Sequence, residues 1–213
     1  MKSRVYSIVY MFVLTVAFTA LVGGVKSLSQ ERIQRNQDLK LQRIILRVLD
    51  IKVDPHASDR DLAALFQSRI KTVRVGERLL YLAKAENGQG LAGIAFPVHG
   101  QGFWGPIQGM AAVNPKGQKL TGLAFYKHNE TPGLGGRMTE PWFQDQFKGL
   151  ALHPLEKGRR IFYLKPQGTS QKPEELDAIT GATQSSMAIE AFLNRELDNF
   201  VRNIKGKLEG VSD

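Results

Sequence analysis

The feature that most constrains this chain is an apolar run from Val5 to Val25 that contains no charged residue. Lys2 and Arg4 precede the run, and Lys26 follows it. A helix rises about 1.5 Å per residue, so about 20 apolar residues cross the hydrocarbon core of a bilayer. The run therefore predicts a single transmembrane helix.

A cleaved signal peptide is the alternative interpretation of this run. The apolar region of a signal peptide typically has about 7 to 15 residues and is followed by a small-residue cleavage site. This run is longer and no clear A-x-A site follows it, which favours a retained anchor. Basic residues flank both ends, so the sequence leaves the orientation across the membrane open.

The chain beyond the anchor predicts an α+β protein. Residues 1–28 are expected to form the transmembrane anchor and residues 29–72 the stalk and linking helices. Residues 73–213 are expected to form one domain, with a mainly antiparallel sheet packed by helices. This domain carries the residues on which a function depends.

Three helices are expected outside the anchor. The stalk helix covers Ser29–Leu49 and is broken by Asp54 and Pro55, and a second helix is capped by Ser58 or Asp59 and runs through Ile70. The last helix is expected from about Ser185 to about Leu208. Its apolar residues recur at spacings of three and four: Ile189, Leu193, Leu197, Phe200 and Ile204.

Short apolar runs separated by Gly, Pro and Asn follow Val73, a texture that is typical of strands and turns. The expected strands are Leu79–Lys84, Leu91–Val98, Gly109–Val113, Leu120–Tyr126 and, later in the chain, Arg160–Leu164. The Asn114–Gly117 segment predicts a hairpin turn between the third and fourth of these strands.

Composition excludes several kinds of chemistry. The chain has no cysteine, so it has no disulfides, thiolate metal sites or cysteine-ligated iron–sulfur clusters of its own. Its four histidines are far apart and form no zinc-binding pattern, so no metal site is expected. We therefore expect any redox chemistry to come from a bound organic cofactor, and no residue has the pattern of a catalytic base or nucleophile.

The net charge of +9 raises the question of nucleic acid. Seven of the basic residues lie just after the apolar run, where they either contact anionic lipid headgroups or form a plain solvated face. They are Lys26, Arg32, Arg35, Lys40, Arg43, Arg47 and Lys52. No aromatic residues alternate with them as in RNA-binding segments, so we expect the bilayer and not nucleic acid to be the partner.

The most informative segment is DAITGATQSS, from Asp177 to Ser186, immediately before the last predicted helix. The N-terminus of a helix offers unpaired N–H donors and a partial positive charge, which stabilise a phosphate ester. Gly181 and Ala182 leave the backbone accessible to a bulky substituent on Thr183. Taken alone, the segment is more typical of an ordinary helix cap.

The DAITGATQSS segment resembles the D-x-x-[ST]-G-A-T-x-[ST] motif of the FMN-binding domain family. This family includes the C subunit of the sodium-translocating NADH:quinone oxidoreductase and the G subunit of the Rnf complex. The resemblance implies that Thr183 carries FMN through a phosphoester made by a separate flavin transferase, and that Thr180, Gly181 and Ala182 border the cofactor. Thr180 stands where many members have serine and retains the hydroxyl.

A second segment, HNETPGLGG from His128 to Gly136, resembles the H-x-E-T-P-G-L-G loop of the same family. The resemblance makes Glu130, Thr131, Leu134 and Gly135 candidates for the flavin pocket. The GFWGPI segment adds Trp104 as a further candidate, because a large aromatic side chain can stack on the flavin. A tryptophan is nevertheless more often a core residue.

The resemblance implies an electron-transfer subunit of a membrane redox complex, in which other membrane subunits are the partners. It also implies a domain on the periplasmic or extracellular side of the cytoplasmic membrane. The chain is short for the C subunit of the oxidoreductase, so which of the two complexes it serves stays open. The alternatives are a free-standing flavin-binding module, in which Thr183 is only a cap, and a non-redox assembly subunit.

Overall fold

A computed structural model of the protein describes residues 2–86, 88, 90–155, 160–204 and 206. The chain divides into two compact units, Met1–Leu41 and Gln42–Asp213. The sheet, the remaining helices and all three segments singled out in the sequence belong to the second unit.

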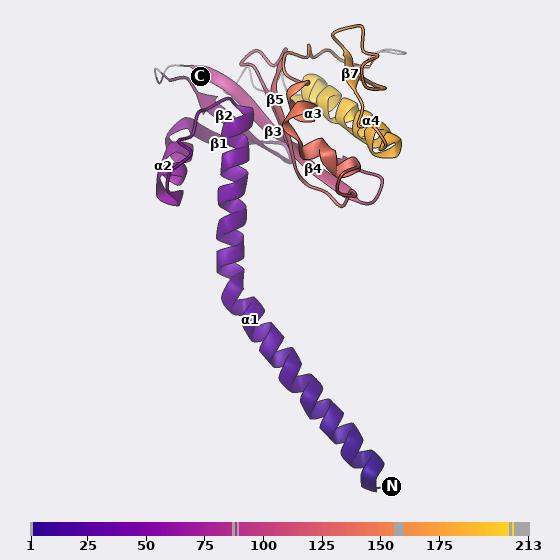
Figure 1. The fold of residues 1–213 in the computed structure, drawn as a ribbon. Helices are drawn as coiled ribbons and strands as arrows, with labels where there is room; N and C mark the ends of the chain where they lie inside the picture. The colour runs from indigo at the N-terminus through magenta and orange to yellow at the C-terminus, as the bar shows by residue number, and fades with distance from the viewer. Residues whose placement is uncertain (1, 87, 89, 156–159, 205, 207–213) are drawn as a thin grey trace. The chain divides into compact units, whose positions relative to one another are not determined.

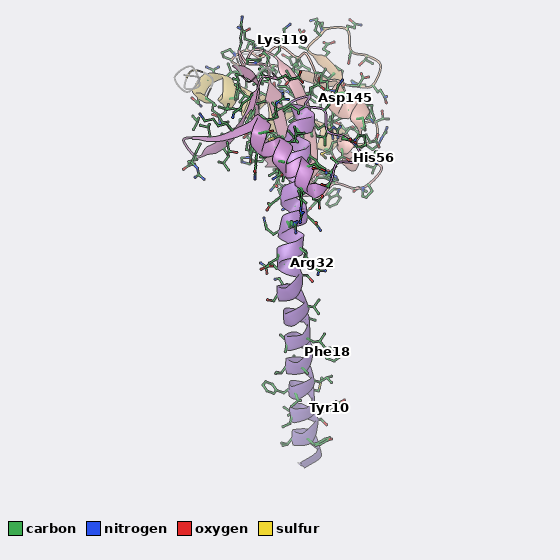
Figure 2. The ribbon with its side chains drawn as sticks, turned by 90° about the vertical axis from the view of Figure 1, so that its left-hand side faces the viewer. Tyr10, Phe18, Arg32, His56, Lys119 and Asp145 are labelled. Atoms are coloured by element: carbon green, nitrogen blue, oxygen red, sulfur yellow. The ribbon has the colours of Figure 1, made fainter. Side chains whose placement is uncertain are left out.

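The first unit is the greater part of helix α1, which runs from Lys2 to Val48. The most apolar stretch of this helix has a mean hydropathy of 2.3, and none of it is buried against protein. Figure 2 shows Tyr10 and Phe18 projecting away from the helix axis. Among the described residues, this is the one helix that is long and apolar enough to span a bilayer.

Helix α1 ends earlier than the expected break at Asp54 and Pro55. Asp50 has a left-handed backbone with φ 57°, and the N–H of Ile51 donates to the carbonyl of Leu46 at 2.9 Å. This arrangement satisfies a carbonyl of the last helical turn and turns the chain out of the helix.

The second unit is built on one antiparallel sheet of five strands in sequence order (Figure 1). The strands are β1 (Ile70–Val75), β2 (Arg78–Lys84), β3 (Leu91–Gln101), β4 (Pro106–Val113) and β5 (Leu120–Lys127). The four expected strands of this region and the hairpin after Val113 are confirmed. Strand β1 was not expected, because its alternation of apolar and charged residues continues directly from the preceding helix.

One face of the sheet is covered by helix α4 (Thr183–Asn199) and the π-helical turn η2 (Phe200–Ile204) (Figure 1). The rings of Phe96 and Phe200 stack with centroids 4.3 Å apart. A Cβ at Gly100 would lie 2.8 Å from a ring carbon of Phe192, so the helix approaches the sheet closely at this point. The helix begins two residues before the expected Ser185, and its expected end at Leu208 lies outside the described residues.

The opposite face of the sheet carries small residues. Ala95 pairs with Ala112, and Ala112 pairs with Gly122 across neighbouring strands. The last turns of α1, which belong to the second unit, pack here, and a Cβ at Gly122 would lie 2.8 Å from the Cα of Val48. The sheet thus separates a large aromatic core on one face from a close helix contact on the other.

The remaining elements are short. Helix α2 (Asp59–Arg69) is capped by Ser58 as expected, but Ile70 already belongs to β1. The others are the 3₁₀-helix η1 (Gly135–Thr139), helix α3 (Pro141–Asp145), and the parallel strands β6 (Tyr163–Lys165) and β7 (Glu175–Asp177). The strand expected over Arg160–Leu164 is therefore shifted toward the C-terminus, because the backbone of Ile161 and Phe162 bonds to the Asn194 side chain instead.

Candidate functional site

The first turn of α4 presents Thr183 to solvent. Thr183 is the first helical residue and is exposed, and the N-cap residue Ala182 provides no side-chain cap. Gly181 has φ +79°, a left-handed conformation that a residue with a Cβ rarely adopts. Within the described part of the chain, the N–H groups of Thr183, Gln184 and Ser185 have no hydrogen-bond acceptor. The turn therefore offers an accessible hydroxyl beside free N–H donors.

Side chains of the DAITGATQSS segment hold the loop that leads into α4. The Asp177 carboxylate accepts hydrogen bonds from the N–H of Gly168 at 3.1 Å and from the Ser170 hydroxyl at 3.0 Å. The Ser186 hydroxyl accepts from the N–H of Ile179 at 3.1 Å. These bonds fix the entry to the helix, so Asp177 and Ser186 act on the loop and not on Thr183 itself.

Thr180 has a contact of the same kind, since its hydroxyl donates to Gln167 Oε1 at 2.8 Å. Like Thr183, it is exposed. Gln146 completes the frame by exchanging two hydrogen bonds with the backbone of Asp177. Of the two threonines in the segment, Thr183 has the hydroxyl without a described partner.

The HNETPGLGG loop lies against the same turn. The carbonyl of Thr131 accepts hydrogen bonds from the N–H groups of Leu134 and Gly136, at 3.2 and 3.0 Å, which closes the loop before η1. A Cβ at Gly181 would lie 3.3 Å from Leu134 Cδ2, so Leu134 borders the backbone that precedes Thr183. The side chain of Thr131 is exposed.

Glu130 joins all three segments. Its side chain is only 4% exposed. Oε1 accepts a hydrogen bond from the N–H of Trp104 at 2.9 Å, and Oε2 accepts one from the Ser185 hydroxyl at 2.6 Å. The carboxylate therefore links the β3–β4 turn to the first turn of α4. Sequence reasoning missed Ser185 as a site residue, although its place in the motif was visible.

The β3–β4 turn holds an exposed aromatic pair. Trp104 is 64% exposed and Phe103 is 52% exposed, and their rings meet edge to face with centroids 4.9 Å apart. The expectation that Trp104 is more often a core residue is wrong here, because the turn is closed by a bond from the Gly102 N–H to the Gly105 carbonyl and leaves both rings outside the core. Leu134 and Met187 are also exposed, at 44% and 60%. These four side chains are most of the exposed large apolar side chains among the described residues of the second unit, and they lie in the three segments that Glu130 and the first turn of α4 bring together.

A cavity of about 550 Å³ opens at a different place, between the loop after α3 and strands β6 and β7. Its lining contains Lys119, Lys148, Arg160, Lys165 and Lys172 but none of the candidate site residues. The pKa of Glu175, which lines this cavity, is lowered mainly by a hydrogen bond from the Gln171 backbone and further by the positive charges of Lys165 and Lys172. Among the described residues, no cluster of metal-binding side chains is found.

Comparisons with known proteins support the resemblance seen in the sequence. Residues 102–198 match the model of the FMN-binding domain family, a range that contains every candidate site residue. The chain is 33% identical over 140 residues to the C subunit of the Na(+)-translocating NADH-quinone reductase of Neisseria meningitidis serogroup A, which covers 66% of this chain and 50% of that protein. It is 34% identical over 118 residues to the C subunit of the same reductase from Pasteurella multocida, covering 55% and 44%. The chain thus spans about half the length of these curated relatives.

Two solved structures share the fold. The crystal structure of the C subunit of the Na(+)-translocating NADH-quinone reductase from Parabacteroides distasonis has a TM-score of 0.67 at 22% identity, covering 81% of this chain and 95% of that chain. The crystal structure of NqrC from Shewanella oneidensis has a TM-score of 0.68 at 19% identity, covering 80% and 97%. The predicted α+β fold, with a mainly antiparallel sheet packed by helices, is confirmed.

Proposed function

From the match of residues 102–198 to the FMN-binding domain family, we propose that this chain is a membrane-anchored flavoprotein subunit that carries FMN on Thr183. Its function is to pass electrons within a membrane redox complex of the sodium-translocating NADH-quinone reductase type. The observation that carries the proposal is the exposed, uncapped Thr183 at the start of α4.

The first turn of α4 suits the phosphate of the cofactor. A phosphoester on the Thr183 hydroxyl would be stabilised by the free N–H groups of the same turn, where the helix dipole favours negative charge. Because the N-cap residue Ala182 makes no side-chain cap, no capping side chain competes with the phosphate for these N–H donors. Gly181 adds no Cβ beside the substituent.

The surroundings of Thr183 suit a flat aromatic ring. Phe103, Trp104, Leu134 and Met187 expose apolar surface, and such patches on soluble domains mark sites of interaction. We expect the isoalloxazine ring to cover part of this surface, with Trp104 as the stacking partner. The bound flavin supplies the redox chemistry, while the chain fixes its place and its environment.

Attachment requires a group transfer that conserves oxidation state. The Thr183 oxygen attacks the FMN-side phosphorus of FAD, a P–O ester bond forms, and the pyrophosphate bond breaks. AMP leaves with the bridging oxygen, and the hydroxyl proton passes to a base of the flavin transferase or to water. The exposed hydroxyl is accessible to such an enzyme.

The apolar part of α1 anchors the domain, and we propose that the domain lies on the periplasmic or extracellular side of the cytoplasmic membrane. The partners are then the other membrane subunits of the complex, which donate and accept the electrons. The relatives that support this assignment are C subunits of the sodium-translocating reductase, which favours that complex over the Rnf type.

The test is coexpression of the full chain with a flavin transferase, followed by denaturing electrophoresis and flavin fluorescence. We expect a fluorescent band for the wild type and for Thr183→Ser, and none for Thr183→Ala. Thr72→Ala, which changes an exposed threonine on β1, is the control and is expected to stay fluorescent. Fluorescence in Thr183→Ala would show that another residue carries the flavin, and a colourless wild type would favour an assembly subunit.

A further inference from the structure

The structure assigns a role to the buried carboxylate of Glu130 that no family match provides. We propose that Glu130 is a positioning residue: it clamps Ser185 of α4 to the Trp104 turn, and thereby sets where the Thr183 hydroxyl and the exposed aromatic pair lie. This role deepens the proposed function. It rests on that function, because the clamp is proposed to position the groups that receive and contact the flavin.

Both oxygens of the Glu130 carboxylate already accept a hydrogen bond from the protein. One oxygen accepts from the Trp104 N–H at 2.9 Å and the other from the Ser185 hydroxyl at 2.6 Å. Both Glu130 and Ser185 are buried, at 4% and 5% exposure. We therefore expect Glu130 to act through its two partners and not on the cofactor.

Two glycines make room for the clamp. A Cβ at Gly102 would lie 2.5 Å from Glu130 Oε1, and a Cβ at Gly135 would lie 2.8 Å from Oε2 and would also collide with the Ser185 hydroxyl. Real Cβ atoms do not approach so closely. The carboxylate is thus closely approached by the backbone of two loops.

The charge of Glu130 is held by neutral donors. Among the ion pairs of the described residues, none involves Glu130. A buried carboxylate loses its hydration, and two hydrogen bonds from neutral groups offset only part of that loss. The stability of the fold alone therefore gives no reason for a carboxylate at this position. As a rigid acceptor for donors from two different segments, the carboxylate can instead hold the parts of the site together.

The clamp acts at the start of α4, where the N-cap residue makes no side-chain cap. Ala182 provides no cap, so the first turn is fixed by the Glu130–Ser185 bond and by the bond from the Ile179 N–H to the Ser186 hydroxyl. Ser185 lies on the same turn as Thr183, two residues later. A displacement of about 1 Å in a reacting group lowers the rate of a transfer by up to about a hundredfold.

The first experiment measures the rate of flavin transfer from FAD to the full chain by a purified flavin transferase. We expect Ser185→Ala to lower kcat about tenfold or more, and Glu130→Gln to lower it by a smaller factor, with KM for FAD unchanged. Ser185→Thr keeps the hydroxyl and is expected to stay within about threefold of the wild type. The double variant Glu130→Gln/Ser185→Ala is expected to have the same kcat as Ser185→Ala alone or a higher one. The reason is that both substitutions act on the same hydrogen bond between Glu130 and Ser185.

The matched control is Glu196→Gln, which neutralises another buried carboxylate, 6% exposed and paired with Arg78 at 2.8 Å. It lowers stability without touching the first turn of α4, so its transfer rate is expected to equal that of the wild type. If Glu196→Gln and Ser185→Ala lowered the transfer rate equally, the clamp would be overturned. The losses would then come from a general decrease in stability.

The second experiment does not depend on flavin. In the full chain without cofactor, amide hydrogen exchange at Trp104 is expected to speed up about tenfold or more in Glu130→Ala and to stay unchanged in Glu196→Gln. Unchanged exchange at Trp104 would overturn the clamp. If the wild type accepts no flavin while the exchange result holds, the proposed function fails and the clamp stands as a structural contact. If Ser185→Ala and Glu130→Gln accept flavin at the wild-type rate, the inference fails and the proposed function stands.

Discussion

Gly135 is the residue at which the site has least room. We predict that Gly135→Ala lowers the free energy of unfolding by roughly 1–3 kcal/mol, because the new methyl group displaces Glu130 or Ser185 in a packed interior. The same displacement moves the first turn of α4, so covalent flavin should fall well below the wild-type level. Chemical denaturation and flavin fluorescence after electrophoresis measure the two effects.

Gly76→Ala is the control for Gly135→Ala, because it introduces backbone strain without displacing any residue of the site. Gly76 lies in the β1–β2 turn with φ +61°, and no described atom lies within 4 Å of the place that a Cβ would take, so alanine there costs about 1–2 kcal/mol in backbone strain alone. We expect its flavin content to be normal. If both glycine variants lose stability and both keep full flavin, the close contact at Gly135 has no bearing on attachment.

The residues of the site differ in how far the sequence predicts them. Thr183 was predicted as the flavin-bearing residue from the resemblance of DAITGATQSS to a family motif, because that motif lies in one continuous segment just before the last predicted helix. The Glu130–Ser185 bond joins residues 55 positions apart, and no local pattern predicts such a pair. Trp104 was a candidate for stacking on the flavin although its size favours the core, and its exposure depends on the turn that carries it.

At the scale of elements, the close contact between the end of α1 and the sheet rests on Gly122. We predict that Gly122→Ala lowers the free energy of unfolding by roughly 1–3 kcal/mol, since the methyl group would overlap the backbone of Val48. Lys127→Ala on the same strand changes an exposed residue and is expected to stay within about 0.5 kcal/mol of the wild type. Equal urea midpoints for the two variants would show that the helix end moves away without cost.

The elements that the sequence predicted are those with a strong local pattern. Strands β2 to β5 have apolar runs bounded by turn residues, and α2 has the Ser58 capping box with Asp61. Strands β6 and β7 have three residues each, and their pairing depends on a contact between distant segments. Strand β1 lies at the edge of the sheet, where one side needs no apolar partner, so its charged residues obscured the strand pattern.

At the scale of the whole molecule, the boundary between the two units lies inside α1. The unit that begins at Gln42 retains Ile45, Leu46 and Val48, which are all buried in the second unit. The boundary between anchor and domain is therefore a change in the surroundings of one helix. Its apolar side chains are exposed in the first unit and packed on the sheet in the second. A truncation that follows the end of the helix instead of this boundary removes part of the core.

Two truncations test this boundary. A chain that starts at Gln42 is expected to leave the membrane fraction, to unfold cooperatively and to accept flavin on Thr183, because its core is complete. A chain that starts at Ile51 loses three buried aliphatic side chains, each worth about 1.5–3 kcal/mol, and uncovers the small-residue face of the sheet. We expect it to aggregate or to unfold at a much lower temperature, measured by circular dichroism and size-exclusion chromatography. Equal stability of the two chains would mean that the helix end contributes nothing to the domain, and membrane association of the Gln42 chain would place a second anchor within it.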